Sequence, residues 1–304
     1  MVSMFANMIM KKMEVQKDFI FDMKNVKEFR EEFDKMFSKM KPAKGITLEE
    51  IQIGNISAEN YMLNSDDSNS TVMLYLHGGG YFSGSIISYR RFVSILCKKL
   101  NLNAYSINYR LAPEDPYPAG LDDAFFVYKW LLEEKSIPAE NVIIMGDSAG
   151  GGLTLALLHR IGIQNLPQPK AAICLSPWTD LTLSSETYKT KVEEDVFFNE
   201  KNMESSAKAY LQTHSPENPE ISPIFADFNG FPPIFLQVGT REMLLDDSLI
   251  IAEKMKKQGV SVTVDLWEGM FHAFLVFSAI PFIGKLTPEF RKALKNVRKF
   301  VDSL

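Results

Sequence analysis

The sequence predicts an α/β protein in which a mostly parallel central sheet is flanked by helices on both faces. Short apolar runs alternate with longer helix-like stretches along most of the chain. The 304 residues, 46% of them hydrophobic, suffice for one large core. The sequence shows no internal repeat, low-complexity tract or Gly/Ser linker, so we expect residues 1–304 to form a single domain.

The first expected elements are a helix and a hairpin. Apolar side chains recur at three- and four-residue intervals between residues 26 and 40, which predicts an amphipathic helix. A connector at 41–45 leads to two strand-like runs, 46–53 and 57–63, separated by Gly54 and Asn55 in the manner of a hairpin.

Strand and helix signals alternate along the rest of the chain. The expected elements are, in order, a turn at 64–71, strand 72–76, helix 89–100, strand 104–107, helix 120–134, strand 142–145, helix 151–160, strands 171–175 and 234–238, helix 247–258, strand 260–266 and helix 288–301. Such alternation builds a mostly parallel sheet, because each helix carries the chain back to the edge where the next strand begins.

Residues 183–220 interrupt the alternation. They are polar, rich in Glu and Lys, and contain helix-like pieces but no strand. Open α/β sheets place their ligands beyond the carboxyl ends of the strands. We therefore expect this insertion and residues 1–45 to form a helical cap above those ends. Simple packing of the N-terminal helix on the body is the alternative.

Composition excludes several classes of protein. The 33 basic and 38 acidic residues give a net charge of −5, so the electrostatic footprint of a nucleic-acid-binding protein is missing. Cys97 and Cys174 lack the spacing of a zinc site, and we expect free buried thiols and no bound metal. The apolar segment 1–10 is too short to span a bilayer and lacks the features of a signal peptide. A cytoplasmic protein with no membrane or nucleic-acid partner is expected.

The most informative motif is Gly146-Asp147-Ser148-Ala149-Gly150. It follows an apolar strand and precedes a helix-like stretch, so the strained turn between them displays the Ser148 hydroxyl at the end of the sheet. Residues without bulky side chains let the strand and helix approach closely. This arrangement predicts a serine nucleophile.

A serine nucleophile needs a histidine to accept its proton. The chain has four: His77, His159, His214 and His272. In the α/β-hydrolase arrangement the chain order is serine, acid, histidine, each at the end of a strand. Only His272, after the strand expected at 260–266, fits that order.

The acid that orients the histidine is expected after the strand at 234–238. The candidates are Glu242, Asp246 and Asp247. Both aspartates precede a helix, where carboxylates commonly cap free amides. Glu242 is nearer to the end of the strand and has a longer side chain, so it is favoured, with Asp246 as the alternative. Asp147 is excluded, because the acid must lie on the far side of the imidazole from the serine.

An oxyanion formed during acyl transfer needs preorganised amide donors. The run Gly78-Gly79-Gly80 follows the strand at 72–76 and has no β-carbons to keep a substrate away from its backbone. Such a run, with the amide of Ala149 after the nucleophile, is the expected oxyanion hole.

These motifs together resemble the bacterial hormone-sensitive-lipase family of α/β-hydrolases over most of residues 71–280. The matching pieces are HGGG at 77–80, YRLAPE at 109–114, GDSAG at 146–150, SPW at 176–178 and the block 222–239. Many members carry Asp-Pro-Leu-x-Asp at the acid, where this chain reads Glu242-Met243-Leu244-Leu245-Asp246. Aligning the two puts Glu242 in the catalytic position, and a glutamate there is similar to one branch of the family.

The resemblance implies a serine carboxylesterase that hydrolyses short-to-medium acyl esters through a Ser-His-Glu triad and an acyl-enzyme. No cofactor or metal is implied, and the resemblance favours a homodimer formed through an edge strand. Amide or peptide hydrolysis with the same triad remains an alternative. So does a non-catalytic small-molecule receptor on this fold, against which His272 argues.

Overall fold

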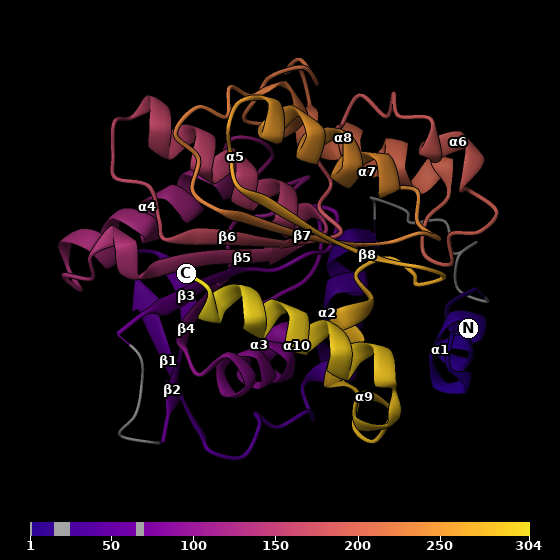
Figure 1. The fold of residues 1–304 in the computed structure, drawn as a ribbon, viewed down its shortest axis with the longest axis horizontal. Helices are drawn as coiled ribbons and strands as arrows, with labels where there is room; N and C mark the ends of the chain where they lie inside the picture. The colour runs from indigo at the N-terminus through magenta and orange to yellow at the C-terminus, as the bar shows by residue number, and fades with distance from the viewer. Residues whose placement is uncertain (1, 15–24, 65–69) are drawn as a thin grey trace.

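An eight-stranded sheet forms the middle layer of the computed structural model, which describes residues 2–14, 25–64 and 70–304 (Figure 1). Its strands are β1 (Ile46–Ile53), β2 (Ile56–Leu63), β3 (Val72–Leu76), β4 (Asn103–Ile107), β5 (Val142–Asp147), β6 (Ala171–Leu175), β7 (Ile234–Gly239) and β8 (Val262–Trp267). The spatial order is β1-β2-β4-β3-β5-β6-β7-β8. The strands from β4 to β8 in that order run parallel, whereas β2 is antiparallel to β1 and to β4. The prediction of a mostly parallel sheet is confirmed.

Helices cover both faces of this sheet (Figure 1). They are α1 (Met4–Glu14), α2 (Val26–Phe37), α3 (Ile86–Leu100), α4 (Ala119–Glu133), α5 (Ala149–Ile163), α6 (Thr187–Thr190), α7 (Glu200–Leu211), α8 (Leu245–Lys257), α9 (Ile283–Leu286) and α10 (Pro288–Asp302). In Figure 1, α4, α5 and α8 lie on one face, and α3 and α10 lie on the other. The insertion contributes α6 and α7 and no strand, as expected.

Alternating side chains of the buried strands build two cores. In β3, Leu74 and Leu76 pack with residues of α4, α5 and α8, whereas Met73 and Tyr75 pack with residues of α3 and α10. Successive side chains of a strand point to opposite faces, so a central strand covered on both sides is apolar throughout. All five residues of β3 are buried, which explains why its sequence shows no polar alternation.

Parallel strand order brings four loops to one edge of the sheet. The glycine run follows β3, Ser148 follows β5, Glu242 follows β7 and His272 follows β8. Because the carboxyl ends of parallel strands meet at the same edge, side chains far apart in the sequence converge there. The strand order alone therefore brings the predicted site residues to one edge of the sheet.

Some elements differ from the sequence-based expectation. The helix α1 was not predicted, and it buries Ala6, Ile9 and Met10. The turn expected at 64–71 falls partly on residues 65–69, outside the described ranges.

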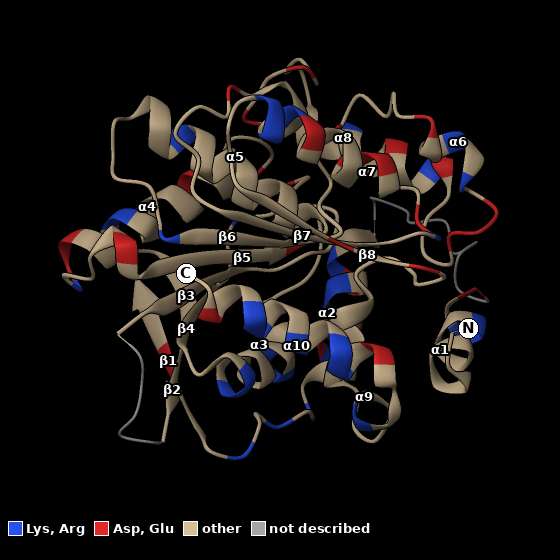
Figure 2. Ribbon diagram, in the orientation of Figure 1, with Lys and Arg blue, Asp and Glu red and all other residues tan. Residues whose placement is uncertain are grey.

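Lys and Arg are interspersed with Asp and Glu over the outer helices (Figure 2). Within the described ranges, no helix is both long and apolar enough to cross a membrane.

Candidate active site

Ser148 occupies a strained turn between β5 and α5. Its backbone has φ 53° and ψ −123°, a conformation that residues with side chains rarely adopt. A Cβ added at Gly146 would lie 2.3 Å from the Gly150 carbonyl oxygen, and one at Gly150 would lie 2.1 Å from the Leu76 carbonyl oxygen. The turn therefore needs glycine at both positions. Strain held by such packing is typical of functional sites.

His272 contacts Glu242 directly. The imidazole Nδ1 lies 2.8 Å from Glu242 Oε2, and both side chains are buried. The other carboxylate oxygen, Oε1, accepts hydrogen bonds from the Gly239 amide at 2.6 Å and the Ser176 hydroxyl at 2.9 Å. Ser176 Oγ in turn accepts from the amide of Ala273, at 3.0 Å. Ser176 thus holds the Glu242 carboxylate and, through the Ala273 amide, the backbone next to His272.

Asp246, the alternative acid, points elsewhere. Its Oδ2 accepts from the amide of Thr187 at 3.1 Å, and its own amide donates to Thr187 Oγ1 at 3.2 Å. Asp247 Oδ2 accepts from the amides of Thr179 and Asp180. Both aspartates therefore tie the helix α8 to the segment after β6. Of the three candidate acids, Glu242 is the one in contact with His272.

The electrostatic environment of His272 favours its protonated form. Burial alone lowers the pKa of an imidazole, but the hydrogen bond and charge of Glu242 and the charges of Asp195 and Asp147 raise it above its ordinary value. Among the described residues, the side-chain hydrogen bond of His272 is the one from Nδ1 to Glu242.

The glycine run is tied to the serine turn by Asp147. Asp147 Oδ1 accepts from the Gly78 amide at 3.0 Å and from the Tyr75 hydroxyl at 2.6 Å, and Oδ2 accepts from the Tyr89 hydroxyl at 2.8 Å. The amide of Gly78 is therefore engaged by protein and is not free for an oxyanion, contrary to its predicted role. Gly79 and Gly80 have φ 117° and 62°, values that favour glycine.

The remaining histidines have other environments. His77 is fully buried, stacks on Tyr109 with 4.3 Å between ring centroids, and places Nδ1 2.8 Å from the Gly78 carbonyl oxygen. Burial lowers its pKa to about 4, so it stays neutral near pH 7. His214 packs edge-on against Tyr117. His159 lies in α5, one residue before Arg160.

Segments far from the strand ends in sequence also reach the site. The Phe198 ring lies 4.6 Å from the His272 ring between centroids, and Phe197 lies 6.2 Å from it. Both belong to the insertion and are half-buried, as is Phe82. Tyr81 and Trp178, which are also near the motifs in sequence, are core residues with 2% and 1% of their surface exposed.

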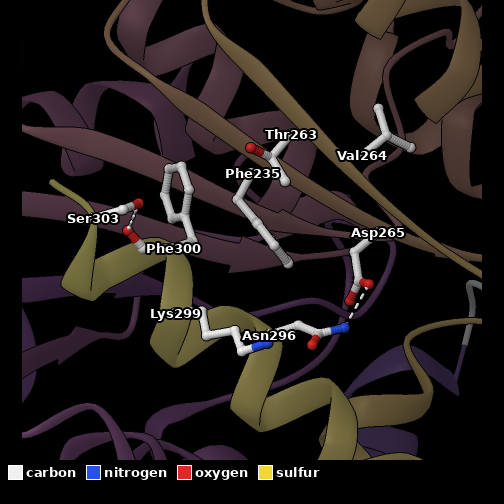
Figure 3. A pocket seen from close by; sticks show the side chains of 8 residues that line it. All are labelled: Phe235, Thr263, Val264, Asp265, Asn296, Lys299, Phe300 and Ser303. Carbon is white, nitrogen blue, oxygen red and sulfur yellow. Dashed lines mark hydrogen bonds between the residues drawn. The ribbon is translucent and has the colours of Figure 1, made fainter.

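A separate hollow of about 380 Å³ lies between β8 and α10 (Figure 3). Phe235 and Phe300 lie on one side of it, and Asn296 donates to Asp265 at 2.8 Å on the other. None of the predicted site residues lines this hollow. Within the described residues, no cluster of His, Cys, Asp and Glu is arranged to hold a metal ion.

Comparison with known proteins identifies the family. A family model described as the alpha/beta hydrolase fold matches residues 73–276. The chain belongs to the α/β-hydrolase family. An esterase of Acinetobacter venetianus is 34% identical to this α/β-hydrolase over 260 residues, which are 85% of this chain and 83% of that protein. An acetyl-hydrolase of Streptomyces hygroscopicus is 33% identical over 251 residues, 83% of this chain and 81% of that protein.

Solved structures agree with this assignment. An esterase/lipase from an uncultured bacterium matches this α/β-hydrolase with a TM-score of 0.89 at 32% identity, over 99% of this chain and 98% of that one. An esterase from the bacterial hormone-sensitive lipase family matches with a TM-score of 0.89 at 30% identity, over 98% and 97%. The α/β-hydrolase described here is a carboxylic ester hydrolase of that bacterial family.

Three residues that hold the site together had no predicted role. Ser176 was noted as part of a motif, and its hydroxyl links Glu242 to the loop after His272. Asp147 was excluded as the acid, and it fixes the glycine run. No sequence motif marks Asp195, which lies inside the insertion. A signal existed for Asp147, since a carboxylate that ends a fully apolar strand must find buried donors.

Proposed function

We propose that this α/β-hydrolase is a serine carboxylesterase acting on small esters of short-to-medium acyl chains, with Ser148 as nucleophile, His272 as base and Glu242 as orienting acid. The observation that carries the proposal is the 2.8 Å contact between His272 Nδ1 and Glu242 Oε2. That contact fixes the ring so that Nε2 is the nitrogen left to accept a proton.

The reaction proceeds in two steps. Ser148 Oγ attacks the ester carbonyl carbon while His272 accepts its proton, and the imidazolium then protonates the departing alcohol, leaving an acyl-enzyme. A water molecule gives its proton to His272 and attacks the acyl carbon, and the acid is released as Ser148 regains its proton. Glu242 holds the ring and stabilises its positive charge throughout.

The amides of Gly79, Gly80 and Ala149 bind the oxyanion in this proposal. Ala149 begins α5, so its amide lies at the positive end of the helix dipole. Gly79 and Gly80 have no side chains of their own to keep a substrate from their amides, and each donor of this kind typically contributes about 3 to 4 kcal/mol to transition-state stabilisation. Gly78 is omitted because its amide already donates to Asp147.

We also propose that residues of about 1–45, which include α2, and the insertion 183–220 form a cap over the site. The Arg30 guanidinium of α2 donates to the carbonyl oxygens of Phe82 and Ala112, each at 2.6 Å, and pairs with Glu114. Phe82 follows the glycine run by two residues, so this anchor connects α2 to the loop that carries the proposed oxyanion donors. Residues 15–24, which precede α2, lie outside the described ranges.

A cytoplasmic location and a homodimer complete the proposal. The free, buried thiols of Cys97 and Cys174 suit a reducing compartment. The strand β8 lies at the edge of the sheet and carries Leu266 with 50% of its surface exposed, which is a suitable position for pairing between subunits. Light scattering during gel filtration measures the oligomeric state, and a monomer at all concentrations would contradict the dimer.

Activity and labelling test the catalytic proposal. The protein should hydrolyse p-nitrophenyl butyrate and incorporate a fluorophosphonate at Ser148, and Ser148→Ala should lose both activities while keeping its melting temperature. Rates over p-nitrophenyl esters from acetate to palmitate should fall at long chains. Labelling without ester hydrolysis would favour an amidase or peptidase, and absence of both would favour a receptor.

A further inference from the structure

Asp195 is a buried carboxylate of the insertion that has no part in the proposed triad. Only 1% of its surface is exposed. Oδ1 accepts from the amides of Phe197 at 2.8 Å and Phe198 at 3.1 Å, and Oδ2 accepts from the amide of Met243 at 2.8 Å. Every one of these bonds is accepted and none is donated, which is the pattern of an ionised carboxylate.

Two of these bonds hold the groups that flank His272, the proposed base: the Glu242 loop and the Phe198 ring. Met243 directly follows Glu242, so the bond from its amide fixes the loop that carries the acid. Phe198 places its ring 4.6 Å from the His272 ring, so the bond from its amide fixes an aromatic wall against the imidazole. One carboxylate thus links the insertion to the acid loop and to the side of the histidine.

Asp195 is also one of three carboxylates whose charge acts on His272. Glu242 lies after β7, Asp147 ends β5, and Asp195 comes from the insertion. Burial raises the pKa of Asp195 itself, while the charge of His272 and the three amide donors oppose that effect. A buried negative charge near the imidazole is weakly screened, so it stabilises the imidazolium that forms during acyl transfer.

We propose that Asp195 is a positioning residue for ester hydrolysis, which holds the Glu242 loop and the Phe198 ring around His272 and stabilises the transient imidazolium. The inference rests on the proposed Ser148–His272–Glu242 triad. Asp195 transfers no proton and touches no substrate. Its contribution is to the geometry and basicity of His272, so the insertion supplies part of the catalytic apparatus as well as a cover.

A purely local role makes a different prediction. A carboxylate that accepts from amides two and three residues later can simply stabilise a turn. Loss of such a turn would lower the melting temperature and leave the pH dependence of catalysis unchanged. A local turn does not account for the bond from the Met243 amide, 48 residues away in the chain, which ties Asp195 to the Glu242 loop. Nor does it account for the Phe198 ring that this carboxylate holds 4.6 Å from the His272 ring.

The test compares Asp195→Asn with Glu193→Gln, which removes one negative charge from an exposed position of the same segment. For p-nitrophenyl butyrate, kcat of Asp195→Asn should fall about ten- to a hundredfold with little change in KM. The acidic limb of its kcat/KM profile should move to lower pH, because His272 loses a stabilising charge. Glu193→Gln should keep the wild-type kcat and profile.

The outcomes separate this inference from the proposed function. Wild-type protein without esterase activity or fluorophosphonate labelling would refute the triad itself. An active wild type whose folded Asp195→Asn variant keeps both kcat and the acidic limb would refute the role of Asp195 alone. Asp195→Ser, whose hydroxyl can still accept from a turn amide, provides a second neutral variant if the amide side chain prevents folding, and the same shift of the limb is expected.

Discussion

Glu242 divides its two carboxylate oxygens between two tasks. Oε1 is held by the Gly239 amide and the Ser176 hydroxyl, which leaves Oε2 directed at His272. A shorter aspartate at this position would have difficulty reaching both sets of partners at once. The longer side chain compensates for the position of residue 242 on the loop, and this explains how a glutamate can serve where many relatives are expected to use aspartate.

Replacement of the candidate acids should give unequal results. Glu242→Ala should lower kcat on p-nitrophenyl butyrate by about three to four orders of magnitude, because the imidazole loses its orienting partner. Asp246→Ala should remain within a few-fold of wild type, because its carboxylate contacts Thr187 instead. Steady-state kinetics on both variants, with circular dichroism to verify folding, makes the comparison. Activity lost only in Asp246→Ala would reverse the assignment.

The pH dependence of hydrolysis should follow His272. Its pKa is raised above the ordinary value of 6.5, so the midpoint of the acidic limb of kcat/KM should lie above 6.5. His77 should not contribute to that limb, because its pKa is lowered to about 4. A profile measured from pH 5 to 9 tests this, and a midpoint well below 6.5 would contradict it.

The raised pKa of His272 makes folding stability and catalytic activity depend on pH in opposite directions. The folded protein binds the His272 proton more tightly than the unfolded chain, so this group's contribution to stability is complete below pH 6.5 and is lost as pH rises through the raised pKa. Catalysis needs the neutral imidazole and therefore works best where that contribution is smallest. Activity and folding stability therefore favour opposite protonation states of His272.

At the scale of elements, the strand–turn–helix unit of β5 and α5 does more than present a serine. Asp147 ends β5 and fixes the glycine run through Gly78, while the next residue begins the turn. Asp147 and Ser148, adjacent in the chain, thus join the proposed nucleophile to the loop of the proposed oxyanion donors. Tyr75 and Tyr89, from β3 and α3, complete the set of donors around the Asp147 carboxylate.

Asp147→Asn should weaken catalysis through the oxyanion loop. An amide nitrogen in place of Oδ1 loses the bonds from Tyr75 and Gly78, and one in place of Oδ2 loses the bond from Tyr89, so the hold on the loop weakens in either orientation. We expect kcat to fall about tenfold or more with a smaller effect on KM, because the proposed donors Gly79 and Gly80 are misplaced and not removed, and stability to fall by about 2 kcal/mol. Asp227→Asn, at an exposed position, is the matched control. Unchanged kcat would argue against the coupling.

The sequence predicted the elements well where hydrophobic pattern decides them. β1, β3 and β6 match the expected ranges, and the helix expected at 288–301 extends one residue further, to Asp302. The same alternation located the four strand ends, and hence Ser148, Glu242 and His272. The contacts of Ser176 and Asp195 could not be predicted, because they join residues 66 and 48 positions apart and depend on how the insertion packs. Gly78 illustrates the limit: its sequence context suited an oxyanion donor, but its amide faces Asp147.

At the scale of the whole molecule, Arg30 and Asp34 of α2 join this helix to the α/β body. Arg30 donates to two backbone carbonyl groups and pairs with Glu114, whose pKa it lowers. Asp34 of the same helix accepts from Ser85 Oγ at 2.6 Å, at the start of α3. These contacts connect the beginning of the chain with segments more than fifty residues later.

Arg30→Ala should loosen this connection. Two carbonyl groups lose their donor, so we expect the free energy of unfolding to fall by about 1 to 2 kcal/mol and cleavage before residue 45 by a protease to accelerate. Lys35→Ala, on the exposed side of α2, should change neither. Denaturant titration and timed proteolysis followed by mass spectrometry give both quantities. Equal cleavage rates in all three proteins would show that Arg30 does not anchor the helix.

The position of His272 just beyond β8 has a consequence for biosynthesis. β8 is the edge strand and pairs only with β7 in the described sheet. Ser148 precedes His272, its proposed base, by 124 residues, so a growing chain contains both proposed catalytic groups only after β8 has been made. On the proposed triad, ester hydrolysis therefore requires that β8 has already joined the sheet beside β7.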